Sequence, residues 1–164
     1  MSTSTNTIAP PDQVDVRGPR FAAWVTTVVL VATLLVAAVS PVGAAVLLGG
    51  QAAVFALGAW LGPRSHPYGL VFSRLVAPRL AAVTEKEPAA PLRFAQFVGL
   101  LFAVVGVIGF AAGYLLLGLV ATGFALVAAF LNAAFGICLG CQLYPLVARL
   151  TQTSSNRKEF ANGT

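Results

Sequence analysis

Charge is scarce in this chain: only 9% of its 164 residues are charged, whereas 58% are hydrophobic. A soluble globular domain carries roughly 25% charged and 45–50% apolar residues. The low charge and the mean hydropathy of +0.86 therefore exclude an ordinary soluble domain and indicate an integral membrane protein. The 16 glycines and 10 prolines are scattered among apolar residues, which excludes a collagen-like or disordered chain.

Charged residues are absent from four long apolar runs, which cover residues 21–39, 42–61, 94–113 and 115 to beyond 135. Each run is close to the roughly 20 helical residues that cross a hydrocarbon core about 30 Å thick. Because the runs are continuously apolar, helices are favoured over the alternating strands of a membrane barrel. We expect an all-α, four-helix membrane bundle of two helical hairpins. It would form a single domain over residues 15–150, between a disordered polar tail (1–14) and a polar C-terminal tail (151–164).

All ten Lys and Arg residues lie near the termini or between the second and third runs. Loops rich in Lys and Arg stay on the cytoplasmic side, so both termini and the loop over residues 62–93 are predicted to be cytoplasmic. The net charge of +5 is thus a topology signal, and we expect no nucleic-acid partner. A cleaved signal peptide is disfavoured for the first run, because Asp12 and Asp15 stand where a basic leader would be.

The loop between the second and third runs contains an amphipathic stretch over residues 70–83, in which apolar residues interleave with Ser73, Arg74 and Arg79. This pattern predicts a short helix at the membrane interface, and Pro78 should kink or end it. Two roles stay open for this helix: a linker that anchors to the lipid headgroups, or a surface that docks a partner.

No Asp, Glu, Lys, Arg or His falls inside the four runs. Pumps and ion-coupled carriers generally need such groups at membrane depth, so these classes are disfavoured. The uncharged polar residues, among them Gln51, Gln96 and Asn132, are expected to join helices by hydrogen bonds. Gly136 and Gly140 form a G-x-x-x-G that extends a small-residue ridge on the fourth helix. We interpret this ridge as a packing seam of the bundle or of a homo-oligomer.

The only two cysteines, Cys138 and Cys141, have C-x-x-C spacing. On a helix, positions i and i+3 share a face, so both sulfurs can point to one side at the cytoplasmic end of the fourth run. A complete zinc or iron–sulfur site needs about four ligands, and the chain adds only the distant His66, which we interpret as a loop histidine. We therefore expect no cofactor and no metal in one chain, although two chains together could supply four cysteines.

Two functional interpretations of the cysteine pair stay open. The spacing favours thiol redox or sulfur-transfer chemistry, in which one thiolate attacks a partner and the other resolves the intermediate. The reducing cytoplasm would keep the resting pair as a dithiol. The alternative is a non-catalytic membrane subunit or small-solute channel whose cysteines only pack, since buried cysteine is a good apolar filler.

Three stretches resemble the bacterial membrane family catalogued as domain of unknown function 4395: VDVRGPRFAA at 14–23, PLRFAQFVG at 91–99 and NAAFGICLGCQLY at 132–144. The resemblance implies a small multi-pass protein of the cell membrane in actinobacteria and their relatives, often encoded near thioredoxin-like proteins and sulfurtransferases. Such proteins are the partners that the resemblance implies at the cytoplasmic face, besides the lipid bilayer. Val16 stands where relatives often carry proline, which changes the entry to the first helix and leaves the cysteine argument intact.

Overall fold

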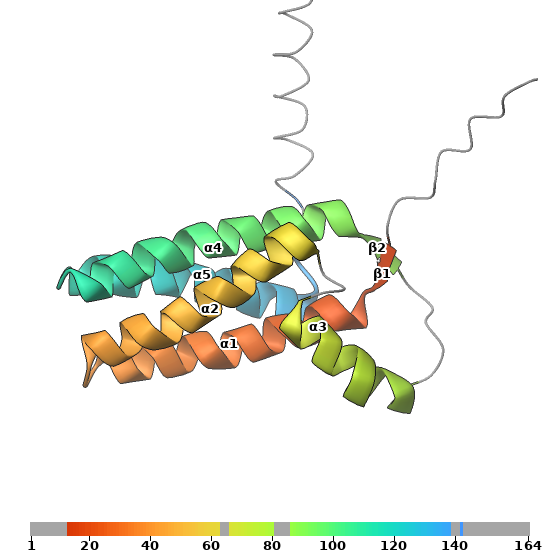
Figure 1. Ribbon diagram of the computed structural model, residues 1–164, viewed down its shortest axis with the longest axis horizontal. Helices are drawn as coiled ribbons and strands as arrows, with labels where there is room; N and C mark the ends of the chain where they lie inside the picture. Colours follow the sequence, from red (N-terminus) through yellow and green to blue (C-terminus); the bar gives the residue numbers. More distant parts are fainter. Residues whose placement is uncertain (1–12, 63–65, 81–85, 139–141, 143–164) are drawn as a thin grey trace, which may run out of the picture.

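Four long helices form the bundle in the computed structural model, which describes residues 13–62, 66–80, 86–138 and 142. The helices are α1 (Arg17–Ala37), α2 (Pro41–Leu61), α4 (Ala89–Ala111) and α5 (Leu115–Phe135). They run alternately in opposite directions, so α1 with α2 and α4 with α5 form two hairpins (Figure 1). All four are long and apolar enough to cross a membrane. The predicted helical membrane bundle is thereby confirmed.

Both hairpins turn at the same end of the bundle, over residues 38–40 and 112–114, which we call the turn end. Ser40 caps α2 there, because its hydroxyl accepts a hydrogen bond from the Gly43 amide at 3.0 Å. Gly113 adopts a positive φ of 80°, which glycine enters without steric cost. The opposite end, where α1 and α4 begin and α2 and α5 end, is called the loop end.

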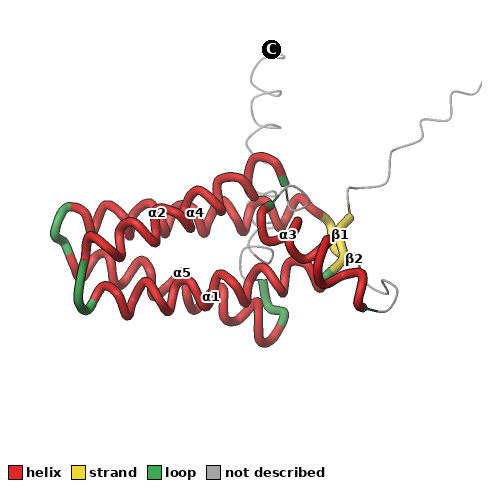
Figure 2. Tube along the Cα trace, turned by 60° about the horizontal axis from the view of Figure 1, so that its bottom comes forward, coloured by secondary structure: helices red, strands yellow, loops and turns green. Residues whose placement is uncertain are grey.

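Small residues let the helices approach closely in the half of the bundle near the turn end. α2 packs most extensively against α4, and α1 against α5 (Figure 2). A methyl group on Gly109 would lie 2.5 Å from the backbone nitrogen of Gly118, and one on Gly106 would lie 2.5 Å from Leu48. Phe110 packs against Gly118 and is buried. These contacts leave no room for a further side chain at the glycines.

Large apolar side chains cover the outside of the four helices as well as their interior. Highly exposed examples are Val28, Leu35, Val42, Val46 and Leu116. Exposing so many apolar side chains to water is unfavourable, whereas the hydrocarbon chains of lipids are apolar as well and can surround them. The outside of the bundle therefore fits the lipid bilayer expected from the sequence.

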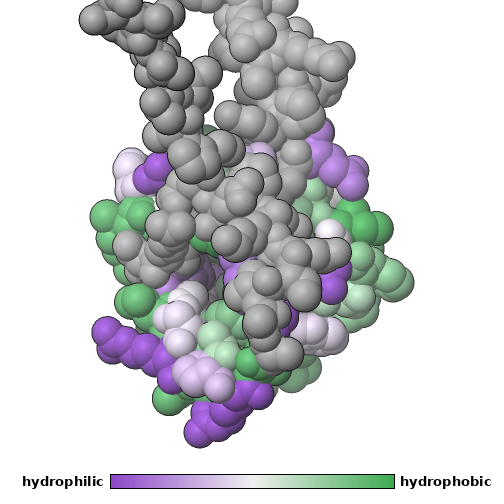
Figure 3. All heavy atoms as spheres, turned by 90° about the vertical axis from the view of Figure 1, so that its right-hand side faces the viewer, coloured by the Kyte–Doolittle hydropathy of each residue, from purple (hydrophilic) through white to green (hydrophobic). Residues whose placement is uncertain are grey.

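A helical arm follows α2 at the loop end. It consists of α3 (Pro67–Val71), the π-helical turn η1 (Phe72–Val76) and the 3-10 turn η2 (Ala77–Arg79). Phe72 anchors the arm on α1, where its ring lies 5.8 Å from that of Phe21. A short helix in this loop was predicted, and it ends just after Pro78 as expected. Figure 3 views the loop end, where hydrophilic side chains lie among apolar ones.

Two short strands, β1 (Gln13–Asp15) and β2 (Lys86–Pro88), pair antiparallel beside the start of α1, with Gln13 opposite Pro88 (Figure 1). The sequence analysis did not anticipate them, because three-residue strands are too short to show a periodic pattern. β1 includes residues 13 and 14, which were expected to belong to the disordered tail. The rest of that tail, and all of the expected C-terminal tail, lie outside the described residues.

Candidate functional site

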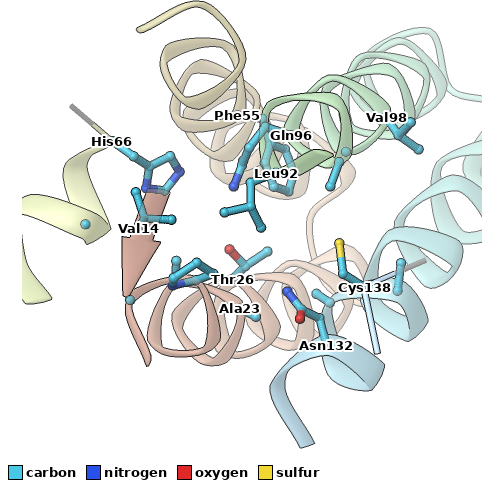
Figure 4. Close-up of a pocket in the computed structure, with 18 of the residues that line it drawn as sticks. Val14, Ala23, Thr26, Phe55, His66, Leu92, Gln96, Val98, Asn132 and Cys138 are labelled. Atoms are coloured by element: carbon cyan, nitrogen blue, oxygen red, sulfur yellow. The ribbon is translucent and has the colours of Figure 1, made fainter. Parts of the chain in front are cut away.

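A cavity of about 710 Å³ occupies the loop end of the bundle and is partly open. It extends between α1, α4 and α5 as far as Phe102 and Phe124, near the middle of α4 and α5. Its wall is mostly apolar, and Figure 4 shows several of the polar exceptions. The polar or titratable lining residues are Asp15, Thr26, His66, Ser73, Gln96, Asn132 and Cys138.

Cys138 lines this cavity because α5 ends before it. The Gly136 amide donates to the Asn132 carbonyl at 3.1 Å, and the Ile137 amide donates to the Leu131 carbonyl at 3.3 Å. Gly136 has a positive φ of 68°, so the helix ends in the left-handed conformation that commonly terminates helices at glycine. The chain then turns, and the Cys138 sulfur points into the cavity (Figure 4).

The structure corrects one expectation for this region. The fourth helix was expected to continue past residue 135 with Gly136 on a small-residue ridge, but Gly136 caps α5 instead. The G-x-x-x-G spacing carries no information about the φ angle that ends the helix. Gly140 and Cys141 lie outside the described residues. The Cys138 carbonyl accepts a hydrogen bond from the Gln142 amide at 3.1 Å.

Arg20 lies directly against Gly136. A methyl group in place of the Gly136 hydrogen would lie 3.0 Å from Cζ of Arg20 and closer still to its Nη2 atom. The guanidinium therefore sits at the C-terminus of α5, where the helix dipole favours a cation. Arg93 has the same place at the end of α2, where it donates hydrogen bonds to the carbonyls of Ala59, at 3.3 Å, and Trp60.

Gln51 links three elements beside the cavity. Its amide nitrogen donates to the Thr26 hydroxyl at 3.4 Å, and its amide oxygen accepts a hydrogen bond from the Tyr68 hydroxyl at 2.9 Å. α1, α2 and α3 are thus joined through a side chain that is almost completely buried. Hydrogen bonds of this kind hold helices together where water is absent.

His66 and Gln96 carry the unsatisfied polar atoms of the site. Within the described part of the chain, Nε2 of His66 and Oε1 of Gln96 are buried without a hydrogen-bond partner. Burial also lowers the pKa of His66 from 6.5 to about 4, so the ring is neutral at pH 7. The sequence analysis treated His66 as an ordinary loop residue, because nothing in the sequence shows that its side chain packs against Gly58.

The cavity brings together three of the residues that the sequence singled out, namely Gln96, Asn132 and Cys138. Asn132 and Cys138 lie on one side of it, and His66 and Gln96 lie on the other (Figure 4). Gln51 is bonded to the lining rather than being part of it. Among the residues that the structure describes, no three His, Cys, Asp or Glu side chains form a group that could hold a metal ion.

A repeat that the sequence analysis missed explains the paired arginines. The triplet Arg-Phe-Ala occurs near the start of α1, at residues 20–22, and near the start of α4, at residues 93–95. Each arginine reaches the glycine that ends the second helix of the other hairpin: Arg20 reaches Gly136, and Arg93 reaches Gly62. The two hairpins are therefore arranged alike at the loop end.

The comparison with protein families agrees with the sequence resemblance. The family model for the domain of unknown function DUF4395 matches residues 14–149. The chain belongs to the DUF4395 family. No curated protein and no solved structure matches it. Because the matched range contains all four long helices and both cysteines, the cavity belongs to the DUF4395 domain itself.

Proposed function

We propose that this DUF4395 protein is a membrane component of thiol or sulfur-transfer redox chemistry, with Cys138 and Cys141 as the reacting pair. The observation that carries the proposal is the position of Cys138, which lines the cavity just beyond the end of α5. Cys141 follows three residues later, a spacing that lets two thiols close a disulfide. Arg20, packed against Gly136, adds a positive charge close to this segment, and positive charge favours the reactive thiolate.

The proposed reaction begins when the thiolate of one cysteine attacks a disulfide of a thioredoxin-like partner. A mixed disulfide forms, and one partner sulfur leaves as a thiolate. The second cysteine then attacks the mixed disulfide, so Cys138 and Cys141 become joined and the partner leaves with two thiols. The partner gains two electrons and the pair loses two. With the persulfide of a sulfurtransferase, the first attack instead transfers the terminal sulfur to the cysteine and releases the partner thiolate.

The proposed location of this chemistry is the cytoplasmic face of a bacterial cell membrane. All ten Lys and Arg residues lie in the termini, in the loop between the hairpins or in the first turns of α1 and α4. Positive loops stay inside, which supports a cytoplasmic loop end with both termini inside. Reporter fusions after Arg149 and within residues 80–90 should both be cytoplasmic. An alkaline-phosphatase fusion that is active at either position would contradict this orientation.

Trapping of the mixed disulfide tests the proposed reaction. Full-length Cys138→Ser, Cys141→Ser and the double variant are compared by non-reducing electrophoresis of cells stressed with oxidant or thiosulfate. The single variant that lacks the resolving thiol should accumulate an adduct with a thioredoxin-like protein, because no second thiol releases the partner. Attack on a sulfurtransferase persulfide would instead leave a persulfide on the remaining cysteine and no adduct. The double variant should form no adduct and should still insert into the membrane, since neither thiol is needed to satisfy the backbone.

A matched control separates a reactive thiol from one that is merely accessible. Ala90 lies at the loop end, is exposed and does not line the cavity. Ala90→Cys in the background of the double variant should therefore trap no partner. If this variant traps the same adduct, the cysteine pair has no special reactivity. If neither single variant forms an adduct and the double variant fully complements a deletion strain, the cysteines only pack and the non-catalytic alternative holds.

A further inference from the structure

Two polar atoms at one wall of the cavity lack a partner among the described residues: Nε2 of His66 and Oε1 of Gln96. His66 is only 3% exposed, so bulk solvent has little access to its ring. Most buried polar groups in folded proteins are hydrogen-bonded, because leaving them unpaired costs free energy. These two unpaired atoms therefore indicate a ligand in the cavity that carries a polar group.

The side chains of His66 and Gln96 both pack on Gly58. A methyl group on Gly58 would lie 2.6 Å from Cδ2 of His66 and 3.0 Å from Cδ of Gln96. In histidine Cδ2 is bonded to Nε2, and in glutamine Cδ is bonded to Oε1, so each of these carbons is one bond from an unpaired atom. One small group can therefore contact both residues, which lie on the same side of the cavity in Figure 4.

The charges around the cavity favour an uncharged ligand. Asp15 is the one charged side chain among the described lining residues, and Arg17 pairs with it at 2.8 Å. Neutral His66 can donate or accept at Nε2, depending on its tautomer, whereas Oε1 of Gln96 accepts only. A hydroxyl group suits both residues, since it can donate to Gln96 while it accepts from His66.

The remainder of the cavity suits a hydrocarbon body. Its volume of about 710 Å³ is far larger than the roughly 30 Å³ that one water molecule occupies in the liquid. Its wall is largely apolar as far as Phe102 and Phe124. Ordered water needs polar partners, and an apolar space offers few of them.

We infer that the cavity binds an uncharged, lipid-like alcohol, whose hydroxyl group lies between His66 and Gln96 and whose hydrocarbon body extends toward Phe102 and Phe124. The surrounding bilayer is the source of such a molecule, because the bilayer dissolves it. This site goes beyond the proposed thiol chemistry and does not depend on it, since no reaction of either cysteine is required.

Photolabelling of the full-length protein in lipid nanodiscs tests the inference. The probe is dodecanol with a diazirine on its chain, and the control probe is its methyl ether, which cannot donate a hydrogen bond. The alcohol should label the cavity-lining peptides of α4 and α5 at a concentration about tenfold lower than the ether, as expected for one hydrogen bond. Unlabelled dodecanol should compete with the alcohol probe.

A variant pair on α4 sharpens the test. Gln96→Met removes the amide with little change in volume and should raise the half-saturating concentration of the alcohol about tenfold without changing that of the ether. Phe97→Leu is the matched control, because Phe97 is the next residue on the same helix and is 44% exposed on its outer side. This change should affect neither probe.

Equal labelling by the alcohol and the ether overturns the inference, as does an absence of labelling in the cavity peptides. The second result assigns the two polar atoms to buried water instead. The comparison of probes uses the unaltered protein, so it decides the question even if Gln96→Met does not fold. Photolabelling by the alcohol does not require a partner protein or a reaction of either cysteine, so a failure of the thiol proposal is distinguishable from a failure of this one.

Discussion

Gly58 is the residue on which the buried wall of the cavity depends. Its missing side chain leaves room on α2 for the side chains of both His66 and Gln96. Gly49, in the same helix, has open space around it, because no atom lies within 4 Å of a methyl group built there. Substituting each glycine in turn therefore distinguishes the steric requirement at Gly58 from the general helix propensity of glycine.

We predict that Gly58→Ala destabilises the bundle by about 1–3 kcal/mol, the usual cost of overpacking. Gly49→Ala should leave stability unchanged or raise it by up to about 1 kcal/mol, because alanine favours the helix. Unfolding of both variants in mixed detergent micelles, followed by circular dichroism, measures the difference. Similar effects of the two changes would show that His66 and Gln96 do not pack tightly against Gly58.

The buried imidazole of His66 makes the stability of the protein depend on pH. In the folded protein burial lowers the pKa of His66 from 6.5 to about 4. Above pH 6.5 the ring is neutral in the folded and the unfolded chain, and stability is at its full value. Between pH 6.5 and 4 the unfolded chain binds a proton that the folded chain does not. The free energy of unfolding then falls by up to about 1.4 kcal/mol per pH unit.

We predict that lowering the pH from 7 to 4.5 reduces the melting temperature of the natural protein more than that of His66→Gln, which has no ionisable group there. Asp15 acts only at lower pH, because a hydrogen bond from Arg17 holds the pKa of its carboxyl below the usual value. Thermal scans over this pH range provide the measurement. Identical pH profiles for the two proteins would mean that the ring is not buried in its neutral form.

Residue types were easier to predict than residue conformations. Gln96, Asn132 and Cys138 stood out in the sequence as polar or reactive groups in apolar runs, and the fold places them around one cavity. The role of Gly136 was not predictable from spacing, because its positive φ and its contact with Arg20 depend on a helix at the other end of the chain. His66 was missed for the same reason, since its burial comes from tertiary packing.

At the scale of the elements, the four long helices followed directly from hydropathy. A span must satisfy its backbone internally and present apolar side chains to lipid, so composition and length nearly determine it. The paired strands β1 and β2 and the π-helical turn η1 had no comparable signal. Their short backbone segments are held by partners that the sequence does not place nearby.

Arg93 of α4 joins the two hairpins at the C-terminal end of α2. Arg93 belongs to α4, yet its guanidinium donates hydrogen bonds to the carbonyls of Ala59 and Trp60 in the last turn of α2. These carbonyls lack partners within their own helix. The contact therefore satisfies the end of α2 and fixes the loop ends of α2 and α4 against each other.

We predict that Arg93→Met lowers the free energy of unfolding by about 1 kcal/mol, because it removes these hydrogen bonds and the favourable charge at the helix terminus. Arg74→Met, on the exposed arm, is the matched control for loss of a positive charge and should have little effect. Unfolding in micelles at low salt measures both variants. Equal losses of unfolding free energy in the two variants would mean that the loss of a positive charge, and not the loss of the hydrogen bonds to the end of α2, causes the destabilisation.

At the scale of the whole molecule, the two ends of the bundle differ in packing. Near the turn end α4 and α5 touch through the backbone at Gly109 and Gly118, and Leu48 of α2 fills the place beside Gly106. At the loop end the same helices separate around a cavity of about 710 Å³. Within the described residues, the bundle is closely packed near the turn end and contains a large cavity near the loop end.

This asymmetry has a bioenergetic consequence. A cavity that ends near the middle of α4 and α5 gives protons no continuous water path along the bundle, so the proton-motive force should survive high expression of the protein. Proteoliposomes loaded with a pH-sensitive dye should hold an imposed pH gradient as long as protein-free vesicles do. Rapid collapse of that gradient would instead support the small-solute channel. A gradient that persists means that the cavity does not connect the two sides of the membrane by a path that protons can follow.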